Sequence, residues 1–167
     1  MKFFYFFFLI ILFFFNVSFS IANDKIAFID LNYILSESKE GKKILAKLEI
    51  DNKKNLEFFQ SEEEKLKKEN QNIEKLKNIL SKEEFNNKIN IFKNKVNTYN
   101  LKKQETIKLF QETKNSELNI FFAELNEIMN NFMQENSIQI ILDKKNIVMA
   151  NNKNDISKDI LKLINIK

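Results

Sequence analysis

The sequence predicts an α+β protein in which a long antiparallel α-helical hairpin projects from a small β body. Three observations predict this class. Hydrophobic residues recur at helical spacing through residues 42–135, short apolar runs typical of strands lie on either side of that region, and the 167 residues include one Gly and no Pro. Because Pro breaks a helix interior and Gly weakens it, the middle of the chain can form very long uninterrupted helices.

The first 22 residues have the pattern of a secretory signal peptide. Lys2 supplies a positive charge, residues 3–15 are apolar, and the small residues Ser20 and Ala22 occupy the positions expected before a cleavage site. The alternative is an uncleaved membrane anchor, since residues 3–22 are long enough to span a bilayer. Polar residues in the second half of the segment favour cleavage after Ala22, and the absence of Cys excludes a lipid-anchored form.

A short strand is expected next, followed by a helical turn. Residues 24–30 contain four consecutive apolar side chains between polar ones, which is typical of a strand covered on both faces. One turn of helix is predicted at residues 31–35. Ser38 is suited to cap the helix that follows, and Gly41 falls in the first turn of that helix.

The middle of the chain predicts two long helices joined by a tight turn. From residue 42 to about residue 80 a sparse heptad repeat runs without interruption, apolar at both ends and polar in the middle. Ser81 and Glu84 match a capping box, which starts a second helix over residues 82–135. At about 1.5 Å per residue, residues 42–81 would span about 60 Å.

The end of the chain predicts a β-hairpin and a last helix. Residues 137–143 and 147–150 are interpreted as two strands joined by a turn at residues 144–146. A helix over residues 158–164 would follow, capped by Asp155 or Ser157. Three strands this short form a thin sheet with open edges, and a body this small buries little core, so oligomerisation is the simplest way to stabilise it.

The sequence therefore divides into three parts: a signal peptide (1–22), a body made of residues 23–41 and 118–167, and a helical-hairpin arm (42–117). The arm carries 18 Lys and 13 acidic residues, while the body has no excess of positive charge. This asymmetry can steer an acidic partner, but mixed Lys and Glu equally serve to solvate a helix. Arg is absent and no dense run of Lys occurs, so no nucleic-acid partner is expected.

The composition excludes most classes of enzyme. Without His or Cys the chain has no Ser-His-Asp or Cys-His nucleophile, no zinc site of the usual N and S ligands, and no disulfide. A single Gly excludes the glycine-rich phosphate-binding loops. We expect no catalytic activity, no cofactor and no metal, and we interpret the acidic run at residues 62–64 as a solvated helix face.

Aromatic and basic side chains of the arm are the candidates for binding a partner. The Phe side chains can pack in the seam between the helices. Polar seam positions nevertheless leave the middle of the hairpin underpacked, and a flexible arm with some exposed apolar surface suits adaptable binding of unfolded chains. The candidate contact residues are Phe58, Phe59, Phe85, Phe92, Phe110, Lys88, Lys95, Lys102 and Lys103.

The order of several short segments resembles that of the Skp/OmpH family of periplasmic chaperones. After the signal peptide come KIAFID at residues 25–30, ILSES at 34–38 and GKK at 41–43. The hairpin turns at LSKEEF, residues 80–85, and the chain closes with IILD at 140–143 and DISKDIL at 155–161. No one of these segments is specific, but the ordered set covers essentially the whole chain.

The resemblance implies a fold, a location and a function. Family members are trimers in which strands of three chains form a central β body and three helical hairpins enclose a cavity. The cavity holds unfolded outer-membrane β-barrel proteins in the periplasm of Gram-negative cells, without ATP. By position, the oligomerisation contacts would be Ile26, Phe28, Ile138, Ile140 and Leu142, and residues 42–117 would form the arm.

Other functions stay open from the sequence. The arms lack Arg, so the family's lipopolysaccharide-binding constellation cannot be assigned, although peripheral contact with membrane lipids remains open. An alternative is a structural coiled-coil envelope protein or spacer with a single folded partner. Its seam should be more regular than the sparse heptads of this chain. A third interpretation is a helical hairpin anchored in the inner membrane by an uncleaved N-terminal segment.

Overall fold

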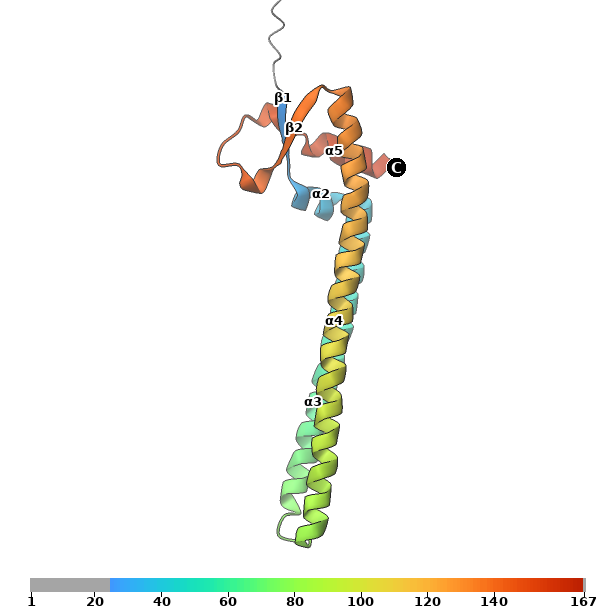
Figure 1. Cartoon of the computed structure of the whole chain (residues 1–167), viewed down its shortest axis with the longest axis vertical. Coiled ribbons are helices and arrows are strands. Elements are labelled where there is room, and N and C mark those ends of the chain that lie inside the picture. Colours follow the sequence, from blue (N-terminus) through green and yellow to red (C-terminus); the bar gives the residue numbers. More distant parts are fainter. Residues whose placement is uncertain (1–24, 167) are drawn as a thin grey trace, which may run out of the picture.

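The computed structural model describes residues 25–166, so the predicted signal peptide lies outside the described residues. Two helices, α3 (Lys39–Lys75) and α4 (Lys82–Glu135), run side by side as a long hairpin, shown in Figure 1. The other elements gather at one end of it: β1 (Lys25–Ile29), α2 (Leu31–Glu37), β2 (Ile138–Asp143) and α5 (Ser157–Ile166). The predicted architecture of a helical arm on a small strand-containing body is confirmed.

The caps of the hairpin explain where its helices begin. Ser38 caps α3 by accepting a hydrogen bond from the Gly41 backbone N–H. At the far end Ser81 and Glu84 form the predicted capping box, in which each side chain accepts a hydrogen bond from the other residue's backbone. The predicted bounds of the second helix are therefore confirmed. The first helix ends at Lys75, earlier than expected, because residues 76–80 form the turn that reverses the chain.

The sheet has two strands, and they are parallel. Ile26 lies opposite Ile140 and Phe28 opposite Leu142, so the whole hairpin is the connection between the paired strands. This agrees with the predicted strands at both ends of the arm. Since parallel strands need a long crossover connection, the arm satisfies that geometrical requirement.

The prediction of a third strand at residues 147–150 is wrong. Asp143 caps a short 3-10 helix, Lys144–Asn146, and the following residues form no strand. The edge of β1 that faces away from β2 is occupied by another segment, because the Ile156 backbone N–H donates a hydrogen bond to the Phe28 carbonyl at 3.0 Å. A second 3-10 helix, Asn152–Asn154, leads into that contact. Val148 and Met149 of the predicted strand are exposed instead.

The hydrophobic core lies where the sheet, the base of the hairpin and α5 meet. Its buried apolar side chains come from all of these elements and from α2, and include Ile29, Ile34, Ile44, Leu48, Phe121, Leu125, Ile138 and Ile160. The predicted last helix is confirmed and runs slightly longer than expected. Farther along α3, beyond Leu48, only Phe59 and Ile73 are buried to this degree. The arm is thus a thin two-helix layer on a compact base.

Candidate functional site

One face of the sheet carries exposed apolar side chains. Among the predicted oligomerisation residues, Phe28 and Ile138 are buried, whereas Ile26, Ile140 and Leu142 are 43%, 47% and 43% exposed. The opposite face, with Ala27 and Ile29, packs into the core. A sheet normally covers its apolar face, so the exposed side chains of Ile26, Ile140 and Leu142 form a surface that is suited to contact with another molecule.

In the middle of the arm the structure brings four of the predicted contact residues together. Phe58 and Phe59 stack edge to face with ring centres 5.9 Å apart. The Lys102 ammonium lies 4.5 Å from the centre of the Phe58 ring, and the Lys103 ammonium lies 5.3 Å from that of Phe59. These cation–π contacts tie α3 to α4 through a buried ring, Phe59, and a half-buried one, Phe58.

The remaining predicted contact residues are distributed along α4. Phe110 is half-buried nearer the body than the Phe58–Phe59 pair. Phe85 and Phe92 are also half-buried, and Lys88 is exposed, but all three lie closer to the hairpin turn and outside this aromatic cluster. The arm therefore presents no single aromatic patch within the described residues, and its aromatic rings are spread over much of its length.

Ion pairs across the hairpin fix the position of one helix against the other. Glu63 accepts hydrogen bonds from the Tyr99 hydroxyl and the Lys103 ammonium, both at 2.6 Å. Lys95 pairs with Glu69 at 2.6 Å, and Lys47 pairs with Glu117 near the body. The hydrogen bonds from Lys103 and Tyr99 hold the pKa of Glu63 below its ordinary value, and the bond to Glu63 holds the pKa of Lys103 above its own.

Sequence reasoning missed these pairs, and counting residues from the turn does not find them. Glu63 and Glu69 lie fewer residues before the end of α3 than Lys103 and Lys95 lie after the beginning of α4. The pairs can be recognised only once the two helices are aligned. Because the pairs are solvent-exposed, each adds little stability, and their effect is to select one alignment of the helices.

Aliphatic side chains also project from the arm into solvent. They come from both helices and alternate with charged residues, so they form no continuous apolar surface on the described part of the arm. The most exposed on the long helices are Ile50, Leu56, Ile91, Leu101, Ile107, Leu109 and Ile120. Scattered exposed side chains are normal in soluble proteins, but in a two-helix arm they give apolar contact points along its whole length.

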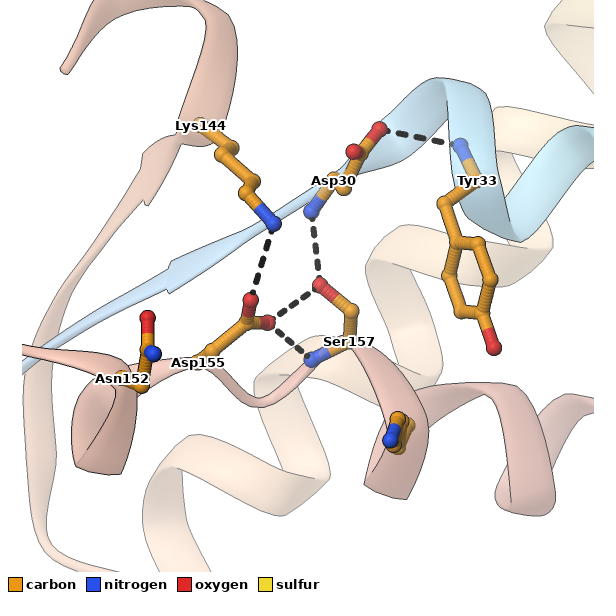
Figure 2. A pocket seen from close by; sticks show the side chains of 7 residues that line it. Asp30, Tyr33, Lys144, Asn152, Asp155 and Ser157 are labelled. Carbon is orange, nitrogen blue, oxygen red and sulfur yellow. Dashed lines mark hydrogen bonds and ion pairs between the residues drawn. The ribbon is translucent and has the colours of Figure 1, made fainter.

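A polar pocket of about 450 Å³ lies in the body, where β1, α5 and the loop before α5 meet (Figure 2). The Ser157 hydroxyl donates a hydrogen bond to Asp155 and accepts one from the Asp30 backbone N–H at 2.9 Å. Lys144 pairs with Asp155 at 3.1 Å, and Asp30 caps α2 through the Tyr33 backbone N–H. Each carboxylate is thus held by donors of the protein, so the network attaches the loop to β1.

Nothing in this pocket indicates catalysis or metal binding. Its side chains include neither His nor Cys. Among the described residues, no group of potential ligands could hold a metal ion. Within residues 25–166, no helix is both long enough and apolar enough to cross a bilayer.

The Asp155 network should make stability depend on pH. Burial alone would raise the pKa of Asp155, but hydrogen bonds from Ser157 and Lys144 outweigh it and hold the pKa below its ordinary value. A carboxyl whose pKa is lowered by folding stabilises the protein at neutral pH, and this contribution is lost as the pH falls through the folded-state pKa. We expect Asp155→Asn to lower the free energy of unfolding by about 1–2 kcal/mol at pH 7.

Urea unfolding at several pH values and one protein concentration measures this effect. The difference between wild type and Asp155→Asn should shrink as the pH is lowered below about 4, where the unfolded-state carboxyl is protonated. Asp159→Asn is the matched control, since Asp159 lies exposed on α5. A difference that stays constant down to about pH 2 would show that the Asp155 charge is not what stabilises the loop.

Comparison with known proteins identifies a family whose model matches the chain and a solved structure of similar fold. The model of the family described as outer membrane protein (OmpH-like) matches residues 25–164. A crystal structure of an outer membrane chaperone candidate (OmpH-like) from Caulobacter crescentus superposes with a TM-score of 0.74 at 19% sequence identity. The alignment covers 87% of this chain and 86% of that one. No curated protein matches the chain.

The family match and the fold agree with each other and with the resemblance drawn from the short segments. At 19% identity the superposition shows a shared fold and nothing more. The family match is independent of that superposition and spans nearly all of the described residues. The chain therefore belongs to the OmpH-like family of outer membrane proteins.

Proposed function

We propose that the protein is an ATP-independent holdase chaperone of the periplasm, which encloses unfolded outer-membrane β-barrel proteins between helical arms. The observation that supports this most is the arm itself, a long hairpin with exposed aliphatic side chains among charged ones. The Caulobacter crescentus protein of the same fold, an outer membrane chaperone candidate, points in the same direction. Export would depend on residues 1–22, with cleavage after Ala22.

The exposed sheet face is the surface through which the chains of this chaperone would associate. We propose that residues 23–41 and 118–167 form a trimeric body, in which Ile26, Ile140 and Leu142 contact the neighbouring chains. Three arms, each formed by residues 42–117, would then extend from one body and surround a cavity. The aromatic and Lys side chains of the arm, together with its exposed aliphatic residues, would contact the client.

Release of a client without an energy source requires that each contact be weak. A client held by one strong site would leave only slowly, whereas several weak contacts exchange rapidly and still retain it through their number. Short apolar side chains dispersed among Lys and Glu provide such contacts. A spacer with a single folded partner would need one defined interface, and none stands out on the described part of the arm.

Light scattering after size-exclusion chromatography of residues 23–167 tests the proposal. The expected result is the mass of a trimer, which gains one client when a urea-unfolded outer-membrane barrel is diluted into it. Ile140→Lys, in the exposed sheet face, should lower the mass to that of a monomer while the helical content is retained. A trimer that lets the client precipitate would contradict the holdase function and favour the spacer. A wild-type protein with the mass of a monomer would contradict the proposed trimer.

A further inference from the structure

Two of the grooves along the arm differ in the number of charged side chains that line them. Consecutive residues divide between them: Phe58 and Lys102 line one groove, Phe59 and Lys103 the other. Since neighbouring residues of a helix point about 100° apart, the grooves open on different sides of the hairpin. We call the groove of about 470 Å³ the amide groove, after four side chains that line it: Asn52, Asn55, Gln60 and Gln111.

The amide groove has an apolar floor and apolar rims. Phe59 is buried at its base and Phe110 is half-buried beside it. Leu56 of α3 and Ile107 of α4 remain 58% and 46% exposed. Apolar side chains of a bound molecule would therefore meet carbon surface from both helices, which is favourable because that surface leaves water.

The opposite groove, of about 630 Å³, has apolar lining residues as well, but five of its side chains are charged: Glu62, Lys65, Glu69, Lys95 and Lys102. Glu62 and Lys65 pair at 2.6 Å along α3, and Glu69 pairs with Lys95 across the hairpin. We call it the charged groove. Among the described residues that line the amide groove, the only charged side chains are Glu63 and Lys103, which neutralise each other at 2.6 Å. An uncharged molecule is therefore better matched to the amide groove.

The four amides of that groove have unused hydrogen-bonding capacity. Within residues 25–166, none of these side chains makes a hydrogen bond to another protein group. A side-chain amide carries two N–H donors and a carbonyl acceptor. The main chain of an extended peptide presents N–H and C=O groups in alternation, so an amide can pair with either kind without regard to the peptide's sequence.

We infer that the amide groove binds extended, uncharged segments of an unfolded chain, pairing its amides with the main chain of the segment and its apolar floor with alternate side chains. The groove follows α3 over residues 52–63, about 16 Å at a rise of about 1.5 Å per residue. An extended chain at about 3.3 Å per residue places about five residues in that length. Strands of membrane barrels have this alternating pattern.

This inference rests on the proposed function and identifies the surface that would carry it. The experiment uses the mature protein and a fluorescent peptide of alternating Leu and Ser, followed by anisotropy. A second peptide of the same sequence, with its backbone amides methylated, lacks the N–H donors. We expect the methylated peptide to bind about tenfold more weakly, since it loses several main-chain hydrogen bonds.

Two matched variants locate the binding. Asn55→Ala with Gln111→Ala removes amides from the amide groove, and Asn94→Ala with Thr98→Ala removes polar groups from the charged groove. We expect the first variant to lose about tenfold in affinity for the unmethylated peptide and the second to lose less than about twofold. Ala is the best helix former, so neither variant should weaken the arm, and circular dichroism checks this.

Several results would overturn the inference: no binding of the peptide to the wild type, equal binding of the methylated peptide, or equal losses in the two variants. Client retention by the wild type separates these failures from failure of the proposed function. If the wild type keeps an unfolded barrel soluble and the amide-groove variant does so equally well, only the inference fails. If the wild type retains no barrel, the proposed function fails as well.

Discussion

Replacing Phe121 by Ala should lower the free energy of unfolding by about 3–5 kcal/mol. The Phe121 side chain is 1% exposed and packs edge to face against Phe122, with ring centres 5.4 Å apart. It belongs to the same buried cluster as Ile44 and Leu48 of α3, so its loss leaves a cavity in the core at the base of the arm. Urea unfolding followed by circular dichroism, at one fixed protein concentration, measures the change.

The neighbouring residue supplies the control. Ile120 has a similar apolar side chain on the same helix but is 66% exposed. Ile120→Ala should change the free energy of unfolding by less than about 0.5 kcal/mol. If the two variants lost similar stability, the contact of α4 with the body would not depend on the burial of Phe121.

Substituting Gly41 by Ala should also destabilise the protein strongly, by about 1–3 kcal/mol or more. At an open helical position this change would stabilise, because Ala forms helix better than Gly by up to about 1 kcal/mol. Here a Cβ atom would lie 2.0 Å from the Leu35 carbonyl oxygen and 2.7 Å from the Ser38 hydroxyl. The junction of α2 and α3 would have to open, which disturbs the cap of α3 and the buried Ile34.

The reverse substitution at Ala46 calibrates this result. Ala46 is exposed in the same helix, so Ala46→Gly reports helix propensity alone and should cost about 1 kcal/mol. Propensity would make the two substitutions opposite in sign, whereas contact with Leu35 makes both destabilising. Thermal unfolding of both variants decides between these outcomes, and a stabilised Gly41→Ala protein would contradict the predicted clash.

The helices were predictable because their signals are local. Ser81 and Glu84 lie three residues apart and make their capping contacts within one turn, so the beginning of α4 could be read from four residues. Ser38 acts in the same way at the start of α3. At the end of α3 the sequence offers no comparable signal, and the predicted boundary was several residues late.

The sheet was harder to predict because its contacts are not local. The apolar run at residues 138–143 and that at 147–150 give the same pattern, yet only the first pairs with β1. What separates them is the hydrogen bond from Ile156 to Phe28, which occupies the other edge of β1. That contact joins residues from opposite ends of the described chain, so no local pattern indicates it.

Some of the candidate binding residues could be predicted from the sequence, and others could not. Side-chain types along the arm suggested Phe58, Phe59, Lys102 and Lys103, and the structure brings these four together. The amides beside them carried no signal in the sequence, because Asn and Gln on a helix surface are usually only solvated. These amides become candidates for binding because they line a groove, and that groove forms only when α3 and α4 are aligned.

The parallel pairing of β1 with β2 has a consequence for the order in which the molecule folds. β1 and its partner strand are separated in sequence by the whole arm, so the sheet forms only when segments far apart in the chain meet. Contacts within the α3–α4 hairpin are closer in sequence and can form early, whereas the core joins β1 and α2 to α5. A folding chain can therefore have its arm before it has a body, and it acquires the exposed sheet face only when β2 pairs with β1.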